Sequence, residues 1–177
     1  MKANLKHILT QSLLFCIPIL SILFLEILIY VPRVNEFFNF LRLSPFYIGI
    51  YYWHQLRPDI FNIFSAFILG IFADVLSSSI LGINVLSFLI LHLISSYMFS
   101  YFNIKKFIYS WLLFSVSLLI TEIFKSIIIS ISYQTIIPIP LMLYELVLTT
   151  ALYPIICRFY LFIETRYIHL EERYENQ

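Results

Sequence analysis

Six apolar runs separated by short polar breaks dominate this sequence and leave it very few architectures. The runs cover residues 8–30, 43–55, 60–76, 80–102, 107–131 and 141–163. The hydrocarbon core of a bilayer is about 30 Å thick and is crossed by roughly 20 apolar residues in a helix. A helix also satisfies its own backbone hydrogen bonds in lipid. We therefore predict an all-α integral membrane protein, a six-transmembrane helix bundle. Because the second and third runs are short, five spans is the alternative.

The composition excludes an ordinary water-soluble domain. Hydrophobic residues make up 61% of the 177 residues and charged residues 12%, whereas soluble domains carry about 25% charged residues. The formal net charge of +1 gives no argument for a nucleic-acid partner, and the lipid bilayer is the expected surrounding. Since no repeat or linker interrupts the pattern, we expect a single multi-pass membrane domain over residues 1–177.

The residue types that bind metals or cofactors are scattered along the chain. Cys16 and Cys157 lie in apolar runs without the spacing of a metal or redox motif, and the four histidines form no HExxH-like ligand set. The sequence also lacks a nucleophile beside a base, a glycine-rich phosphate loop and a soluble region large enough for a catalytic domain. We predict no metal site, no cofactor and no enzymatic activity.

The positions of Lys and Arg predict the orientation, because cytoplasmic loops carry an excess of these residues. The first run follows two lysines as a secretory signal would, but its length and the lack of a cleavage site indicate a retained span. With the N-terminus inside, two of the eleven basic residues fall in outer loops and Lys125 falls within a span. The eight cytoplasmic ones are Lys2, Lys6, Arg57, Lys105, Lys106, Arg158, Arg166 and Arg173. Both termini are therefore predicted to be cytoplasmic.

Five ionisable residues fall inside the apolar runs, and each costs about 3 kcal/mol near the bilayer centre. In the predicted orientation all five map to the outer half of the membrane: Glu26, Asp74, Glu122, Lys125 and Glu145. We expect a polar cluster there that is either structural or binds a partner. For Glu26 and Glu145 the alternative is a carboxylate that reaches toward the headgroups.

Two of these positions carry specific expectations. Glu122 and Lys125 are three residues apart, so they share a helix face and can neutralise each other. Asp74 lies at a helix C-terminus, where the negative end of the helix dipole is unfavourable for a carboxylate. Asp74 therefore needs a partner, which could be an outer arginine, a serine among residues 77–79 or a group on another protein.

Small residues accompany Asp74 along its helix. Ala66 and Gly70 precede it at four-residue spacing, a pattern that lets helices approach closely in lipid. Gly82 is expected to permit the tight turn into the next span. Before this region, the second run ends in aromatic residues suited to the headgroup level, and Arg57 and Pro58 are predicted to form a polar turn.

The same region resembles a known family. The stretch YYWHQLRPDIFNIFSAFILGIFADVLSSSILGINVLSFLILH has an aromatic-rich second span, a proline turn at Pro58, a G-x-x-x-D pair at Gly70 and Asp74, and a following Leu81 and Gly82. It resembles the central signature of the rod shape-determining protein MreD family. Valine follows the aspartate here, where leucine is commoner, which is a conservative departure.

The resemblance implies a non-enzymatic multi-pass protein of the bacterial inner membrane that belongs to the cell-elongation machinery. Family members associate with MreC and, through it, with RodA, its partner class B transpeptidase and MreB. The family's bundle is also similar to the substrate-binding component of energy-coupling-factor vitamin transporters.

Two functional hypotheses follow from the residues and the resemblance. In the first, the outer polar cluster and the small-residue stripe that ends in Asp74 dock the transmembrane helix and juxtamembrane region of MreC, with Asp74 the foremost candidate. In the alternative, Glu122, Lys125 and Glu145, together with aromatic tyrosine and tryptophan side chains, line an outward-facing pocket for a vitamin-type small molecule. The charged tail from Arg158 is expected to be a solvated helix end, with contact to a cytoskeletal partner as the alternative.

Overall fold

A computed structural model of the chain describes residues 16–28, 44–58, 61–77, 81–102, 106–134 and 139–175. The side chains of Tyr133, Leu141 and residues 167–175 are outside this description. The predictions for the start of the first span, for the outer segment 31–42 and for Lys105 fall outside the described residues.

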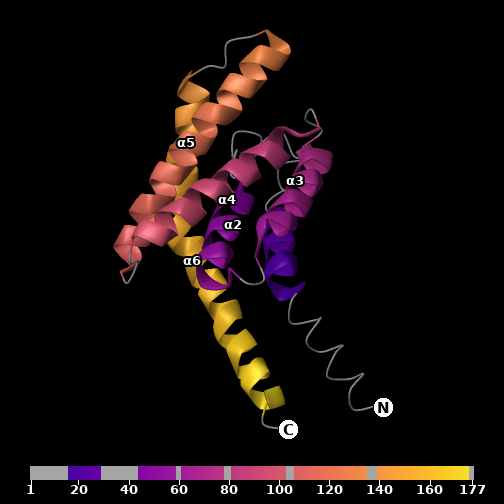
Figure 1. The fold of residues 1–177 in the computed structure, drawn as a ribbon, viewed down its shortest axis with the longest axis vertical. Helices are drawn as coiled ribbons and strands as arrows, with labels where there is room; N and C mark the ends of the chain where they lie inside the picture. Colours follow the sequence, from indigo (N-terminus) through magenta and orange to yellow (C-terminus); the bar gives the residue numbers. More distant parts are fainter. Residues whose placement is uncertain are drawn as a thin grey trace.

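The described residues form six helices and no strand (Figure 1). They are Cys16–Leu28, α2 (Pro45–Leu56), α3 (Ile63–Ser77), α4 (Ile83–Tyr101), α5 (Phe107–Tyr133) and α6 (Ile139–Glu175). Each helix falls on one of the six apolar runs, so the all-α class is confirmed. The segments long and apolar enough to cross a membrane are Ile83–Tyr101, Phe107–Ser132 and Met142–Arg166. The number of crossings stays a prediction for the three shorter helices.

The helices from α2 onward alternate in direction. Side chains early in α2 contact the second half of α5, and later ones contact its first half, as Tyr47 with Lys125 and Tyr51 with Phe114 show. The two helices are therefore antiparallel. The aromatic contacts of α2 with α4 and α6 advance in the same direction along both partners, so α2, α4 and α6 run parallel.

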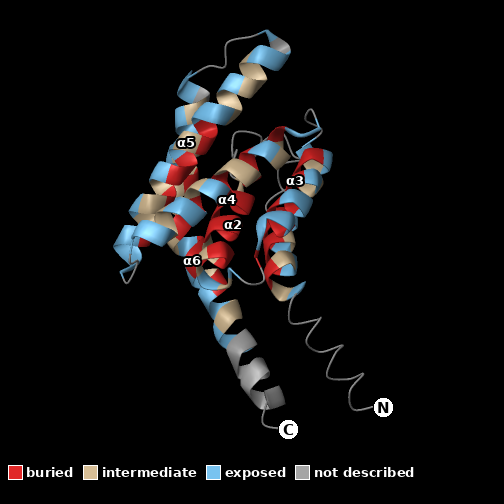
Figure 2. Ribbon diagram, viewed as in Figure 1, coloured by how far each residue is buried: buried red, intermediate tan, exposed pale blue. Residues whose placement is uncertain are grey.

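α2 is the centre of the bundle. Nine of its twelve residues are buried, and it contacts α4, α5 and α6 (Figure 2). A helix that is apolar all round is stable when it is surrounded by other helices. Tyr51 and Trp53, expected at the headgroup level, are instead fully buried in the core. Their hydroxyl and indole groups find partners there: Tyr51 donates to the carbonyl of Ser110, and Trp53 donates to the hydroxyl of Ser21.

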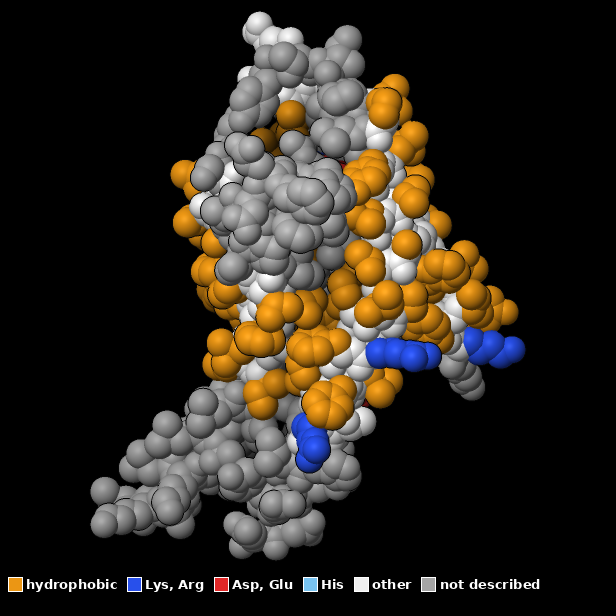
Figure 3. Space-filling view, turned by 180° about the vertical axis from the view of Figure 1, so that it is seen from behind, with side chains coloured by type: hydrophobic (Ala, Val, Ile, Leu, Met, Phe, Trp, Pro, Cys, Tyr) orange, Lys and Arg blue, Asp and Glu red, His pale blue; other side chains and the backbone are white. Residues whose placement is uncertain are grey.

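Large hydrophobic side chains cover the outside of the other helices. Exposed leucine, isoleucine, valine and phenylalanine residues occur along α3, α4, α5 and α6, and one hydrophobic face is visible in Figure 3. Soluble monomers rarely expose contiguous apolar surface on this scale. The surface is therefore suited to lipid, as the composition predicts.

Candidate functional site

The turn between α3 and α4 is organised around Asp74, which is only 1% exposed. Its Oδ2 accepts a hydrogen bond of 2.7 Å from the backbone N–H of Gly82, and its Oδ1 accepts one of 2.9 Å from the N–H of Asn84. The carboxylate therefore caps the first turn of α4. The negative end of the α3 dipole is unfavourable for this carboxylate, and the positive end of the α4 dipole offsets that interaction.

Two glycines make this arrangement possible. Gly82 has a φ of 104°, in the left-handed region, which a glycine adopts without strain. The tight turn into α4 was expected to require this freedom at Gly82. A Cβ on Gly70 would overlap the backbone of Val85 in α4, so the small residue permits close approach of α3 and α4. The stripe that ends in Asp74 thus packs within the chain, and its contact with a partner stays a prediction.

A second polar group forms between α5, α6 and α2. The Nζ of Lys125 lies 3.8 Å from the Oε1 of Glu122, so the predicted pair is confirmed. Glu145 in α6 is close enough to interact electrostatically with both residues. The Lys125 Nζ also lies 5.6 Å from the ring centroid of Tyr47 in α2, within cation–π range. Sequence analysis missed Tyr47, because its run of apolar neighbours gives no signal of a charged contact.

The predicted outer cluster therefore consists of two groups at the same end of the bundle. One contains Gly70, Asp74 and Gly82, and the other contains Glu122, Lys125 and Glu145. The alternative for Glu26, a carboxylate that reaches toward the headgroups, is wrong, because this residue is only 4% exposed. The helix Cys16–Leu28 packs on the core, which brings Glu26 near Tyr160 of α6.

The predicted turn after α2 is confirmed. α2 ends at Leu56, and the N–H of Arg57 donates a 2.8 Å hydrogen bond to the carbonyl of Trp53. Pro58 follows in a turn conformation. The carbonyl of Arg57 in turn accepts a 2.9 Å hydrogen bond from the N–H of Phe61, which directs the chain back toward α3.

A groove at the opposite end of the bundle was not foreseen. It consists of two adjoining cavities of about 330 and 320 Å³ between α2, α5 and α6, here called the α2–α5–α6 groove. Both cavities are lined by Tyr52, Phe107, Cys157 and Leu161. Its residues are brought together from positions up to 112 apart in the sequence, and no local motif could have indicated it.

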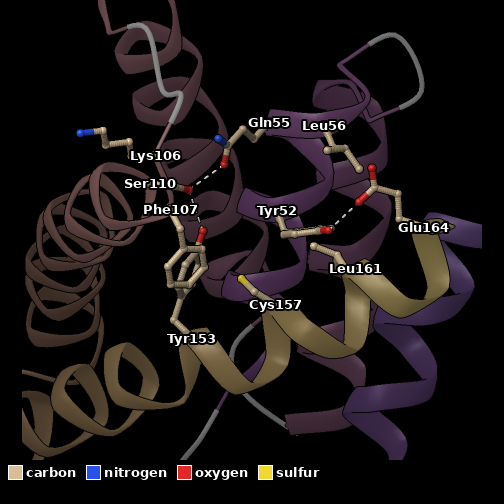
Figure 4. Close-up of a pocket in the computed structure, with 10 residues that line it drawn as sticks. All are labelled: Tyr52, Gln55, Leu56, Lys106, Phe107, Ser110, Tyr153, Cys157, Leu161 and Glu164. Atoms are coloured by element: carbon tan, nitrogen blue, oxygen red, sulfur yellow. Dashed lines mark hydrogen bonds between the residues drawn. The ribbon is translucent and has the colours of Figure 1, made fainter.

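Hydrogen bonds fix one wall of this groove (Figure 4). The hydroxyl of Tyr52 donates to the Oε2 of Glu164 at 2.8 Å. The hydroxyl of Ser110 donates to the Oε1 of Gln55 at 2.7 Å and lies 2.8 Å from the hydroxyl of Tyr153. Residues from three helices are thus tied together around the cavity.

Two histidines that are far apart in the sequence also meet. The rings of His54 in α2 and His92 in α4 are buried, with their centroids 4.1 Å apart. The Nδ1 of His54 lies 3.2 Å from the carbonyl oxygen of Phe61, which assigns the proton to that nitrogen. Within the described residues, no group of three or more His, Cys, Asp or Glu side chains is placed to hold a metal ion.

Comparison with known proteins gives one match. A sequence profile of the family described as rod shape-determining protein MreD matches residues 8–163. No curated protein and no solved structure matches the chain. The expected similarity to the substrate-binding components of energy-coupling-factor transporters therefore stays a prediction.

Proposed function

The chain belongs to the MreD family of rod shape-determining proteins, and we propose that it is a non-enzymatic membrane scaffold of the bacterial cell-elongation machinery. The family supplies the general role in rod shape. The specific role proposed here is to support lateral peptidoglycan synthesis by binding MreC. RodA, its class B transpeptidase and MreB would then be linked to this protein through MreC.

We further propose that the protein is a multi-pass inner-membrane protein with both termini in the cytoplasm. The distribution of basic residues supports this orientation. Arg57 follows α2, Lys106 precedes α5, and Arg158 and Arg166 lie in the second half of α6. Given the alternating helix directions, all four lie toward the same end of the bundle, as the positive-inside rule expects of a cytoplasmic face.

One observation carries the proposal that α3 receives MreC. The face of α3 that adjoins the Gly70 and Asp74 face carries exposed hydrophobic side chains, namely Phe64, Phe67, Ile68, Ile71 and Val75. These positions follow the three- and four-residue spacing of a single helix face. A transmembrane helix such as that of MreC can pack along this stripe through van der Waals contact.

In this proposal Gly70 and Asp74 act on docking indirectly. Gly70 allows α3 to lie against the backbone of α4, and Asp74 joins the end of α3 to the start of α4. Together they set the position of the exposed α3 stripe. We therefore expect Asp74→Ala to weaken MreC binding and to make rod-shaped cells round.

The α3 stripe can be tested without disturbing the core. Ile71→Trp places a bulky side chain on the exposed stripe, and Ile155→Trp places one on an exposed position of α6. Co-purification with tagged MreC should fall for Ile71→Trp and stay normal for Ile155→Trp. Unchanged MreC recovery and full rod shape with both Ile71→Trp and Asp74→Ala, at normal protein level, would refute the docking proposal.

A further inference from the structure

We propose that the α2–α5–α6 groove binds an anionic glycerophospholipid, with the headgroup phosphate held by Lys106 and Arg158 and an acyl chain lying along the apolar wall. This inference goes beyond the scaffold role and does not depend on MreC. It assigns a ligand to a cavity that the shape-determining function leaves unused.

The groove has the size and continuity that a lipid requires. Its two cavities, about 330 and 320 Å³, share four lining residues, so they form one continuous depression. Each volume lies at the lower end of the range of small-molecule sites. A lipid acyl chain can occupy such a depression while the second chain remains in the bilayer.

The groove opens toward the surface that lipid would cover. Phe107 and Leu161, which line both cavities, are also exposed large hydrophobic side chains. Pro154 adds to the apolar wall of the second cavity. A lipid can therefore enter laterally, without leaving the bilayer.

Basic residues lie at the rim of both cavities. Lys106 lines the first cavity, and Arg158 lines the second. Lys106 also directly precedes the apolar segment Phe107–Ser132, which places it at the headgroup level. Figure 3 shows Lys and Arg side chains at the lower margin of a hydrophobic face. Basic pockets between helices at this level are suited to anionic lipid headgroups.

The side chain of Lys106 has to turn for this contact. In Figure 4 its ammonium group points away from the cavity, but a lysine side chain is flexible and presents a mobile point charge. Arg158 is exposed and can offer several N–H donors to the same phosphate. Glu164, which accepts a hydrogen bond from Tyr52, lines the other side of the first cavity. Its negative charge opposes the binding of an anionic headgroup.

The hydrogen-bonded wall makes the groove a prepared site. Ser110 is bonded to Gln55 and lies in contact with Tyr153, so residues of α5, α2 and α6 keep their places without a ligand. A rigid wall lowers the entropy cost of binding. The polar groups of this wall already have partners, which leaves the apolar side chains and the basic rim to recognise the lipid.

The test uses the full protein in phosphatidylcholine nanodiscs that contain increasing fractions of dibrominated phosphatidylglycerol. Bromine on the acyl chains quenches tryptophan fluorescence at short range, and Trp111 lies one helical turn from Phe107 in α5 while Trp53 is fully buried. We expect saturable quenching by brominated phosphatidylglycerol. Equal quenching by brominated phosphatidylcholine would show an unselective lipid layer and would overturn the proposal.

Matched variants measure the contribution of charged side chains to lipid binding. Lys106→Gln combined with Arg158→Gln should raise the half-saturating lipid fraction roughly tenfold. Arg166→Gln changes another exposed arginine of α6, one that lines neither cavity, and should have no effect. Glu164→Gln removes the opposing charge and should lower the half-saturating fraction. An effect of Arg166→Gln equal to that of the double variant would overturn the site.

Two further arms identify the ligand. Leu161→Phe adds bulk to the groove without adding a tryptophan, leaves both basic residues in place and should weaken the saturable quenching, so the test does not depend on the folding of the double variant. Glycerol 3-phosphate at millimolar concentration should not displace the lipid. Complete displacement by glycerol 3-phosphate would show a site for free phosphate compounds and refute the lipid assignment.

Discussion

The indole Nε1–H of Trp111 in α5 donates a hydrogen bond of 2.9 Å to the carbonyl oxygen of Thr150 in α6. Thr150 lies four residues before Pro154, which is inside α6. Proline has no N–H, so it cannot donate the helical hydrogen bond that this carbonyl would otherwise accept. The tryptophan therefore satisfies a carbonyl that the proline leaves open, and it joins the two longest helices of the bundle.

This relationship predicts a coupling between two substitutions. Trp111→Phe should lower the free energy of unfolding by about 1–3 kcal/mol, because a carbonyl in an apolar environment loses its partner. With Pro154→Ala in place, the alanine N–H can bond to Thr150, and Trp111→Phe should cost less. Thermal unfolding of the four proteins in one detergent measures the coupling. Equal losses in both backgrounds would show that the indole contributes only packing.

The carboxylate of Asp74 provides a second prediction. Asp74→Ala removes the acceptor for two backbone N–H groups at the start of α4 and should destabilise the protein by about 2 kcal/mol. Asp74→Asn keeps one acceptor oxygen and should cost less than Asp74→Ala. The measurement is thermal stability of both variants in detergent. If the two variants were equally unstable, the charge of Asp74 and not its capping bonds would be the main contribution.

The sequence was sufficient to predict features that depend on neighbouring residues. The apolar runs located the helices, the three-residue spacing predicted the Glu122–Lys125 pair, and Gly82 marked the turn with positive φ. Each of these rests on the geometry of a single helix or turn. The requirement of Asp74 for a partner also followed from the position of a carboxylate at the end of a helix.

The arrangement of the helices could not be predicted in the same way. In lipid, a helix in the core and a helix at the surface are both apolar, so hydropathy could not identify α2 as the central helix or α5 as a lipid-facing one. Two partners of the Asp74 carboxylate are the backbone N–H groups of Gly82 and Asn84, and backbone groups carry no sequence signal. The pairing of Tyr52 with Glu164 spans 112 residues, so only the folded bundle shows it.

The ion pair of α5, in which Glu122 is buried and the Lys125 side chain is 20% exposed, predicts a rescue between two substitutions. Lys125→Met leaves the buried carboxylate of Glu122 without its 3.8 Å partner and should be strongly destabilising, by about 3–5 kcal/mol. Adding Glu122→Gln removes the uncompensated charge, so the double variant should be more stable than Lys125→Met alone. Yield in the membrane fraction and thermal stability in detergent measure both effects. A double variant less stable than Lys125→Met would show that Glu122 is held by groups other than Lys125.

Labelling of introduced cysteines tests the orientation of the bundle. Leu81 is exposed in the turn before α4, and Lys106 is exposed just after the segment that follows α4, so the two positions lie at opposite ends of this helix. In a background with Cys16 and Cys157 replaced by serine, Leu81→Cys should react with a membrane-impermeant maleimide in intact spheroplasts. Lys106→Cys should react only after permeabilisation, because basic residues are retained on the cytoplasmic side. The reverse pattern would invert the bundle, and labelling of both positions from one side would mean that α4 does not cross the membrane.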